Sequence, residues 1–245
     1  MVDNEFAVIF DLDGTLIDSM TNFSTMVIKN LKQRGITDIK RLADNLKKDL
    51  ANKSRMMPSG PKIILIPKLF WKIGRKAGLS RFQSLFFTIH CVSKARNVYF
   101  NAPLFSDAKD SLTQLRAAGF KLGIYTLASR KELDLSLKKH NLLDFFVPNS
   151  IISRNEVKSI KPDPEGVFLA FERCSVHPNH GVYIGDMPMD IIAGNRAGAT
   201  TIGVTTGLIN AQNLKQLCEP DMVFDSLKEA SNWILDFFLH KKVES

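Results

Sequence analysis

The stretch IFDLDGTLID, residues 9–18, decides the fold. In it an apolar run of strand type ends in two acids, Asp11 and Asp13, and the chain then turns at Gly14. Two carboxylates held in one site repel each other and shift each other's pKa. A glycine directly after them gives the backbone the freedom to make a tight turn. The pattern therefore predicts a strand that ends in a site where something positive offsets the repulsion.

Short apolar runs of the same type recur along the chain and alternate with helical patterns. We expect strands over residues 7–11, 121–126, 149–153, 182–186 and 200–205. We expect helices between them, over residues 106–119, 129–140, 163–174 and 187–199. Regular alternation of strand and helix is typical of an α/β fold with a doubly wound, Rossmann-like parallel sheet.

Capping residues indicate where two of these helices begin. Ser129 and Glu132 have the spacing of a capping box, in which each side chain bonds the other residue's backbone. Asp163 followed by Pro164 predicts an N-cap and a first helical residue, a position where the missing proline N–H costs nothing.

Residues 19–100 do not fit the alternation. An amphipathic helix is expected over 19–35, and residues 38–53 and 78–98 also favour helix. We therefore expect an α-helical cap domain, residues 19–100, inserted into an α/β core domain formed by residues 1–18 and 101–245.

The formal charge is divided unequally between these two parts. The chain carries +8 in total; residues 19–100 hold 17 Lys+Arg and 3 Asp+Glu, which gives +14, and the rest hold 16 and 22, which gives −6. A solvated, lysine-rich surface is the default interpretation. An electrostatic funnel for an anionic substrate is an alternative. Contact with nucleic acid or a membrane surface is another, through the basic segment 68–78 with Phe70 and Trp71.

Composition and residue spacing argue against several classes of protein. The 44% hydrophobic and 24% charged residues are ordinary for a soluble globular protein. The longest apolar run, 63–73, is interrupted by Pro67 and two lysines and is shorter than the roughly 20 apolar residues of a membrane span. The N-terminus lacks the pattern of a secretory signal, so a cytoplasmic location is expected. Three cysteines match no metal-ligand spacing and are expected to be reduced core thiols: Cys91, Cys174 and Cys218.

Polar side chains collect where the predicted strands end. Four acids follow the first and fourth strands: Asp11, Asp13, Asp186 and Asp190. Ligands of doubly wound sheets bind outside the carboxyl ends of the strands, so we expect these acids to converge there. Such an oxygen-rich site suits Mg²⁺, which would also let a carboxylate approach a phosphate group. Lys161 would add a second positive charge, and the hydroxyl of Thr126 could donate to a phosphoryl oxygen.

Four segments, in this order, carry a resemblance to a known family: DLDGT (11–15), IYTLAS with Thr126, SIKPDP with Lys161, and GDMPMD (185–190). Together they resemble the haloacid dehalogenase-like (HAD) hydrolases. The similar branch has a helical cap inserted after the first segment, as in phosphoglycolate phosphatases and β-phosphoglucomutases.

The resemblance implies a role for each of these residues. Asp11 would be the nucleophile that forms an aspartyl-phosphate, and Asp13 the general acid for the leaving group and then the base for water. Thr126 and Lys161 would hold the phosphoryl group. Asp186, with Asp190, would bind Mg²⁺. Asp190 has an alternative interpretation as an acid in the first turn of a helix.

The implied function is that of a Mg²⁺-dependent phosphatase, a phosphoric monoester hydrolase acting on a small phosphorylated metabolite. A phosphomutase would use the same residues and pass the phosphoryl group to a second sugar hydroxyl. A binding protein that uses its basic cap is a third possibility. Leu127 stands where many relatives have Asn, so substrate choice is expected to differ. The sequence predicts neither the substrate nor the oligomeric state.

Overall fold

The chain forms two compact units. The computed structural model describes residues 5–39, 42 and 62–243, with the backbone alone at 62–66, 96 and 239–243. The core unit consists of Met1–Asp18 and Pro103–Ser245, and the cap unit of Ser19–Ala102. The helix expected over 38–53 lies largely outside the described residues.

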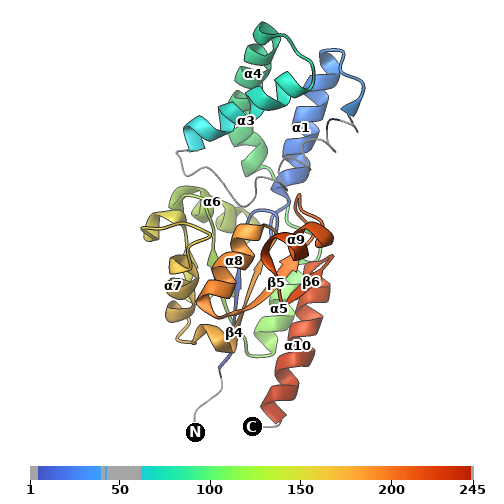
Figure 1. The fold of residues 1–245 in the computed structure, drawn as a ribbon. Coiled ribbons are helices and arrows are strands. Elements are labelled where there is room, and N and C mark those ends of the chain that lie inside the picture. The colour runs from blue at the N-terminus through green and yellow to red at the C-terminus, as the bar shows by residue number, and fades with distance from the viewer. Residues whose placement is uncertain (1–4, 40–41, 43–61, 244–245) are drawn as a thin grey trace. The chain divides into compact units, whose positions relative to one another are not determined.

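The core unit is built on a six-stranded sheet in the order β3-β2-β1-β4-β5-β6, in which every pair is parallel (Figure 1). The strands are β1 (Ala7–Phe10), β2 (Lys121–Tyr125), β3 (Ile151–Ile152), β4 (Gly181–Gly185), β5 (Thr200–Val204) and β6 (Met222–Phe224). The predicted doubly wound sheet is confirmed. Strand β6 was not predicted, because its three half-buried residues show no clear period.

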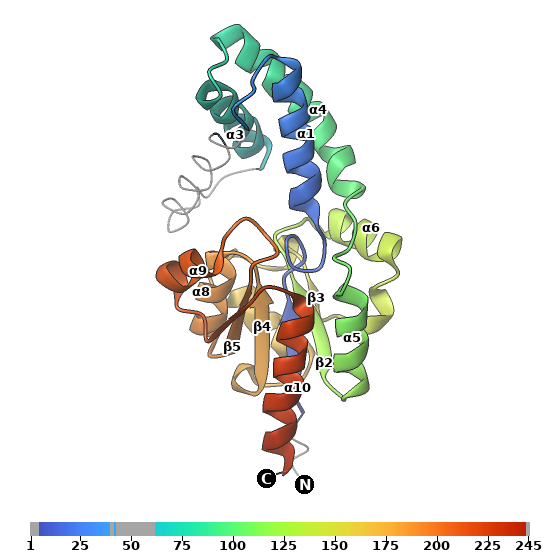
Figure 2. The same ribbon diagram turned by 90° about the vertical axis from the view of Figure 1, so that its right-hand side faces the viewer.

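Helices cover both faces of this sheet, as Figure 2 shows. On one face lie α7 (Glu165–Arg173), α8 (Pro188–Ala197) and α9 (Ala211–Cys218), and on the other α5 (Ala108–Ala117), α6 (Arg130–His140) and α10 (Leu227–Val243). Three short 3₁₀ helices complete the unit: η1 (Leu143–Phe145), η2 (Arg154–Glu156) and η3 (Pro178–His180). Because both faces are covered, β1 and β4 are buried along their whole length.

The helix ends follow the sequence at one predicted site and depart from it at the other. The capping box of Ser129 and Glu132 is present at the start of α6. The predicted start of α7 was wrong, because Pro164 is the N-cap residue and the helix begins at Glu165. The carboxylate of Asp163 still accepts a hydrogen bond from the Glu165 N–H, at 3.0 Å, so it caps from one residue further out.

Within the described residues, the cap unit contains α1 (Ser19–Gln33), α3 (Lys62–Lys76) and α4 (Arg81–Phe100). Helix α3 was not predicted, since Pro67 and the lysines interrupt its apolar run. The core of the cap unit includes Phe70 of α3 and Phe87 of α4, whose rings meet edge to face with centroids 6.4 Å apart.

No helix in the described ranges is long and apolar enough to cross a membrane. All three cysteines are buried free thiols, as expected: Cys91, Cys174 and Cys218.

Candidate active site

Three of the predicted acids meet at the carboxyl edge of the sheet. Asp11 follows β1 and Asp186 follows the neighbouring strand β4, and the Asp11 N–H donates to Ile184 O at 2.8 Å. Asp190 lies in the first turn of α8. One carboxylate oxygen from each of the three acids lies within 4.8 Å of the others, and all three side chains are buried. Asp13 is not part of this cluster, and its role stays a prediction.

Lys161 joins two of these acids. It comes from the segment between β3 and α7, and its ammonium donates to Asp11 Oδ1 at 2.5 Å and to Asp190 Oδ1 at 2.7 Å. Its side chain is only 1% exposed. A buried ammonium in this position compensates part of the charge of both carboxylates and links them to each other.

Two buried tyrosines surround the Lys161 ammonium. Its Nζ lies 4.8 Å from the ring centroid of Tyr125 and 5.3 Å from that of Tyr183, within the range of cation–π attraction. The Tyr125 Oη accepts a hydrogen bond from the Lys161 N–H at 3.2 Å, and the Tyr183 Oη lies 3.4 Å from Asp190 Oδ1. A Cβ on Gly166 would collide with the Tyr125 ring, so glycine is what allows α7 to pack there.

Sequence reasoning missed both tyrosines because they lie inside predicted strands. The available signal was their place, Tyr125 directly before Thr126 and Tyr183 three residues before Asp186.

The electrostatics of the cluster favour a bound cation. Burial raises the pKa of Asp11 from 3.8 to about 7, although the Lys161 ammonium opposes the shift. Burial, with Asp190 and Asp11 nearby, also raises the pKa of Asp186 well above its usual value. Burial alone would lower the pKa of Lys161, but Asp11 and Asp190 outweigh it and hold that pKa well above its usual value. Three ionised carboxylates and one ammonium leave a formal charge of −2.

The surroundings of Asp186 fit a hard cation. Its Oδ1 is buried and accepts no hydrogen bond from other residues in the described part of the chain. A Cβ on either Gly14 or Gly207 would collide with its carboxylate, so the two glycines let the loops after β1 and β5 close around this acid. An all-carboxylate donor set suits Mg²⁺ better than a softer metal, so the residues fit the predicted ion.

Asp190 caps a helix and also belongs to the carboxylate cluster. Its Oδ2 accepts the Met187 N–H at 3.0 Å, which caps the start of α8, while Oδ1 accepts from the Lys161 ammonium. The helix contact therefore orients an acid that also belongs to the carboxylate cluster.

The loops after β1 and β2 carry the remaining predicted groups. Thr126 is buried, and its Oγ1 accepts the Ala128 N–H at 3.1 Å, which leaves the hydroxyl hydrogen available for a ligand oxygen. Gly14 has a φ of +89°, as the predicted tight turn requires. Thr206 Oγ1 donates to Gly14 O at 2.6 Å, so the loop after β5 supports this turn. Sequence reasoning missed Thr206 and Gly207, although they follow a predicted strand.

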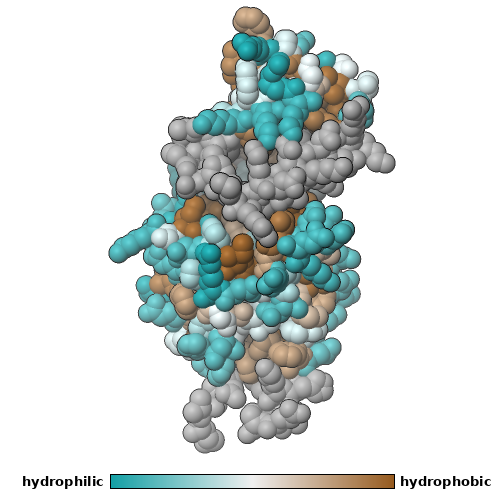
Figure 3. Space-filling view, in the orientation of Figure 1, coloured by the Kyte–Doolittle hydropathy of each residue, from teal (hydrophilic) through white to brown (hydrophobic). Residues whose placement is uncertain are grey.

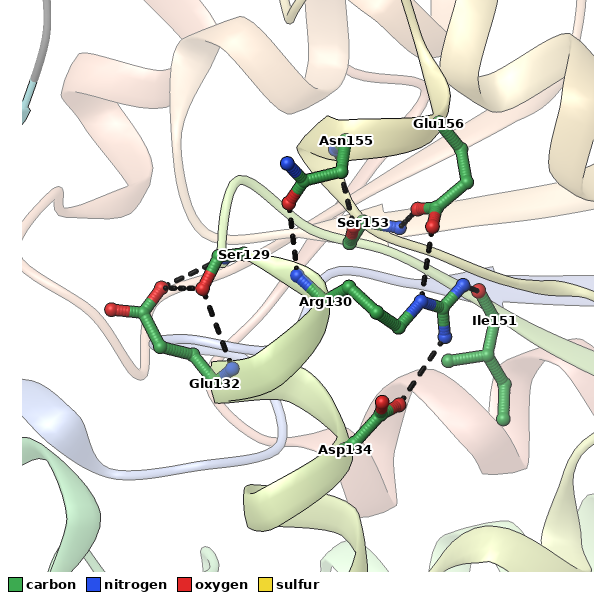
Figure 4. Close-up of polar contacts among 8 residues, drawn as sticks. All are labelled: Ser129, Arg130, Glu132, Asp134, Ile151, Ser153, Asn155 and Glu156. Carbon is green, nitrogen blue, oxygen red and sulfur yellow. Dashed lines mark hydrogen bonds and ion pairs between the residues drawn. The ribbon is translucent and has the colours of Figure 1, made fainter.

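Arg130 ties the loop after β2 to the segment after β3 (Figure 4). The Arg130 guanidinium donates to Ile151 O at 2.6 Å and to Glu156 Oε1 at 3.0 Å. The backbone N–H of Arg130 donates to Asn155 Oδ1 at 3.0 Å. A third guanidinium contact reaches Asp134 at 3.4 Å. The first of these loops begins with Thr126, and the second leads to Lys161. The network therefore fixes the two predicted phosphate-binding segments relative to each other.

Comparison with known proteins places this geometry in a family. The haloacid dehalogenase-like hydrolases match residues 8–204. The chain belongs to this family. It is 26% identical over 231 residues to pyrophosphatase PpaX of Oceanobacillus iheyensis, covering 94% of this chain and 97% of the relative. It is 27% identical over 231 residues to a phosphoglycolate phosphatase of Psychrobacter arcticus, covering 93% and 95%.

Solved structures of other proteins share the fold. A HAD family hydrolase from Deinococcus radiodurans, with bound phosphate and sodium, has a TM-score of 0.74 at 22% identity, covering 96% of this chain and 97% of that one. A putative β-phosphoglucomutase from Thermotoga maritima has a TM-score of 0.67 at 20% identity, covering 95% and 99%. The comparisons confirm the predicted HAD resemblance, the capped α/β fold and the enzyme class, a HAD-like phosphatase.

Proposed function

We propose that this phosphatase depends on Mg²⁺ and hydrolyses a small phosphorylated metabolite through an aspartyl-phosphate on Asp11. The observation that carries the proposal is the buried Lys161 ammonium held between Asp11 and Asp190. The ammonium holds the candidate nucleophile Asp11 at the carboxyl end of β1. Nearby lies an Asp186 oxygen that accepts no hydrogen bond from other described residues. This arrangement supports both a bound cation and a carboxylate as the nucleophile.

In the first step a carboxylate oxygen of Asp11 attacks phosphorus. As that O–P bond forms, the bond from phosphorus to the leaving oxygen breaks, and Asp13 donates a proton to the leaving oxygen. Lys161 and Thr126 hold the phosphoryl oxygens. A bound divalent cation would neutralise charge on the carboxylates and on the phosphoryl group, with Asp11, Asp186 and Asp190 as its side-chain ligands.

In the second step water releases the phosphate. Asp13, now ionised, takes a proton from the water as its oxygen attacks phosphorus, and the bond between phosphorus and Asp11 breaks. Inorganic phosphate leaves, and both aspartates return to their starting states. A mutase would instead pass the phosphoryl group to a substrate hydroxyl.

The two full-length curated relatives suggest where a substrate search should start. One is named a pyrophosphatase and the other a phosphoglycolate phosphatase. Phosphoglycolate and pyrophosphate are both small, multiply charged anions. A hexose 1-phosphate belongs in the same panel, since release of free phosphate supports a phosphatase and formation of an isomeric sugar phosphate supports a mutase.

The test of the mechanism is to trap the phosphoenzyme. Substrate carrying labelled phosphorus is mixed with enzyme and Mg²⁺ and quenched in acid, and the label is followed on the protein. Wild type and Asp13→Asn should be labelled, with more label in the variant because its second step is slow. Asp11→Asn should take up no label and lose about 10⁶ in rate. The exposed Asp110→Asn is the matched control. Label on Asp11→Asn would refute the nucleophile assignment.

A further inference from the structure

Helix α4 carries an exposed apolar stripe on one face. Its residues recur at the spacing of a single helical face, and several are large: Phe82, Leu85, Phe86, Ile89 and Val92. Phe82 is 78% exposed, Phe86 61% and Ile89 56%. A contiguous exposed patch of large apolar side chains is uncommon in a soluble protein and marks an interaction surface.

Among the described residues of the cap unit, the core packs on the other side of α4 from this stripe. The opposite face of α4 is the buried one, with Ser84, Phe87 and Cys91 turned into the cap core. On α3, Phe70 is buried in the same core, whereas Trp71 is 37% exposed. Of the two aromatic residues in segment 68–78, Phe70 therefore lies in the core and Trp71 is exposed. The exposed apolar surface on α4 is larger than that of this segment.

The stretch of sequence that contains the stripe carries charge of one sign. Residues 50–106 contain no Asp or Glu and ten Lys+Arg, and they include all of α3 and α4. Along α4, the exposed Arg81 directly precedes Phe82 and the exposed Lys94 follows Val92 by two residues. The basic C-terminal turn of α3, with Arg75 and Lys76, is joined to α4 by residues 77–80 alone. On the face that Figure 3 shows, hydrophilic side chains gather over α3.

We propose that the cap unit binds an anionic lipid surface through α4. The stripe of Phe82, Phe86 and Ile89 would enter the boundary between headgroups and acyl chains, and Arg81 and Lys94 would lie at the level of the headgroups. Large apolar side chains beside basic ones are the composition of helices that lie in a membrane interface. The stripe belongs to the cap unit, whereas the residues of the phosphatase site belong to the core unit, and the proposal does not depend on the proposed mechanism.

Charge and chemistry favour lipid over the other occupants. A second copy of the chain, bound through α4, would oppose two copies of the basic segment 50–106, which contains no Asp or Glu. Nucleic acid would supply the negative charge, but the stripe is largely aliphatic or phenyl and offers no side-chain hydrogen bond to a phosphate or a base. An anionic bilayer satisfies both the charge and the apolar area.

The test is flotation of the full-length protein with lipid vesicles. Wild type should float with mixed phosphatidylcholine–phosphatidylglycerol vesicles, should not float with phosphatidylcholine alone, and should be released by high salt because the attraction is screened. Phe86→Ser with Ile89→Ser should weaken binding at least about tenfold. Phe168→Ser, at a similarly exposed phenylalanine on α7 of the core unit, is the matched control and should bind like wild type.

A second pair of variants tests the charge. Arg81→Gln with Lys94→Gln should weaken vesicle binding about fivefold per charge, whereas Lys109→Gln with Lys131→Gln, both on the core unit, should not. All variants should hydrolyse p-nitrophenyl phosphate at the wild-type rate, which shows that they fold.

Three results would overturn the proposal. In the first, wild type does not bind anionic vesicles. In the second, the stripe variants float like wild type. In the third, wild type binds no vesicles but sediments as a dimer, and the stripe variants sediment as monomers. Duplex DNA binding that the stripe variants do not weaken, with no vesicle binding, would assign the basic surface to nucleic acid instead.

Discussion

Replacing Asp11 by Asn should abolish turnover and yet stabilise the metal-free protein. Burial raises the pKa of this carboxyl from 3.8 to about 7 in the folded chain. Between these two pH values the folded state holds a proton that the unfolded state has released. The free energy of unfolding therefore falls as pH rises through this window, and the loss is complete above about pH 7. Asn resembles the protonated acid and stays neutral throughout.

The size of the effect follows from the pKa. A change from 3.8 to about 7, at 1.36 kcal/mol for each pH unit, gives about 4 kcal/mol of stability lost by wild type at alkaline pH. This is an upper limit, because water and neighbouring dipoles relax around the ionised carboxylate. At a pH near 4 both proteins carry a neutral side chain at this position and should be equally stable.

Urea unfolding in EDTA, followed by circular dichroism at acidic and alkaline pH, measures this difference. Asp110→Asn, at an exposed acid of α5, should unfold like wild type at both pH values. Adding Mg²⁺ should stabilise wild type by about 2.7 kcal/mol at one hundred times its dissociation constant, and should stabilise Asp11→Asn less. A variant that is no more stable than wild type at alkaline pH in EDTA, or one whose advantage is independent of pH, would refute the reasoning.

Three further changes probe the neighbours of Asp11. Lys161→Met should lower kcat/KM at least about 10²-fold in steady-state assays, because it removes the ammonium that would hold the phosphoryl group; a smaller loss would contradict that role. EDTA should abolish activity and Mg²⁺ restore it, and Asp186→Asn should raise the Mg²⁺ concentration for half-maximal rate about tenfold or more. Full activity in chelator would show that the acids serve another purpose. The kcat of Tyr125→Leu should be about one fifth of the kcat of Tyr125→Phe, because Phe keeps a ring beside the Lys161 ammonium. Equal effects of the two substitutions would exclude a role for the ring.

The sequence could predict which residues meet because parallel strands share one carboxyl edge. Asp11, Lys161, Asp186 and Asp190 all follow predicted strands or lie within a few residues of a strand end, so this rule sufficed to group them. It could not show that β1 and β4 are neighbours, which is what places Asp11 next to Asp186. Strand order depends on contacts between distant segments, and spacing along the chain does not encode it.

The sequence did not reveal residues whose role depends on contacts with distant helices or loops. In the sequence, Tyr125 and Tyr183 look like ordinary apolar strand residues. Their rings belong to the site because α7 packs against Tyr125 and because the Lys161 ammonium lies over both rings. Gly207 follows a predicted strand, but its importance lies in how close it comes to Asp186. The residues in these contacts are separated by tens of residues in the sequence, so local sequence patterns could not reveal the contacts.

The α4 stripe was missed for a different reason. Periodicity identifies a helix by contrast between an apolar and a polar face, and α4 is apolar on both. Phe87 and Cys91 are buried, whereas Phe86 and Ile89 are exposed, and nothing in the order of these residues distinguishes one pair from the other. In the described part of the cap unit, the positions of α1 and α3 decide which face of α4 is covered.

The charge of the site explains why it needs both a lysine and a divalent cation. Lys161 pairs with Asp11 and Asp190, and its single charge leaves the cluster at a formal −2 when Asp186 is ionised. A phosphate dianion entering such a site would meet net repulsion, and Asp11 would hold a proton over part of the neutral range. A bound divalent cation brings the cluster to neutrality, so that Asp11 can be ionised and close to phosphorus at the same time. A second lysine would supply half that charge, and it would need its own buried partners to remain in place.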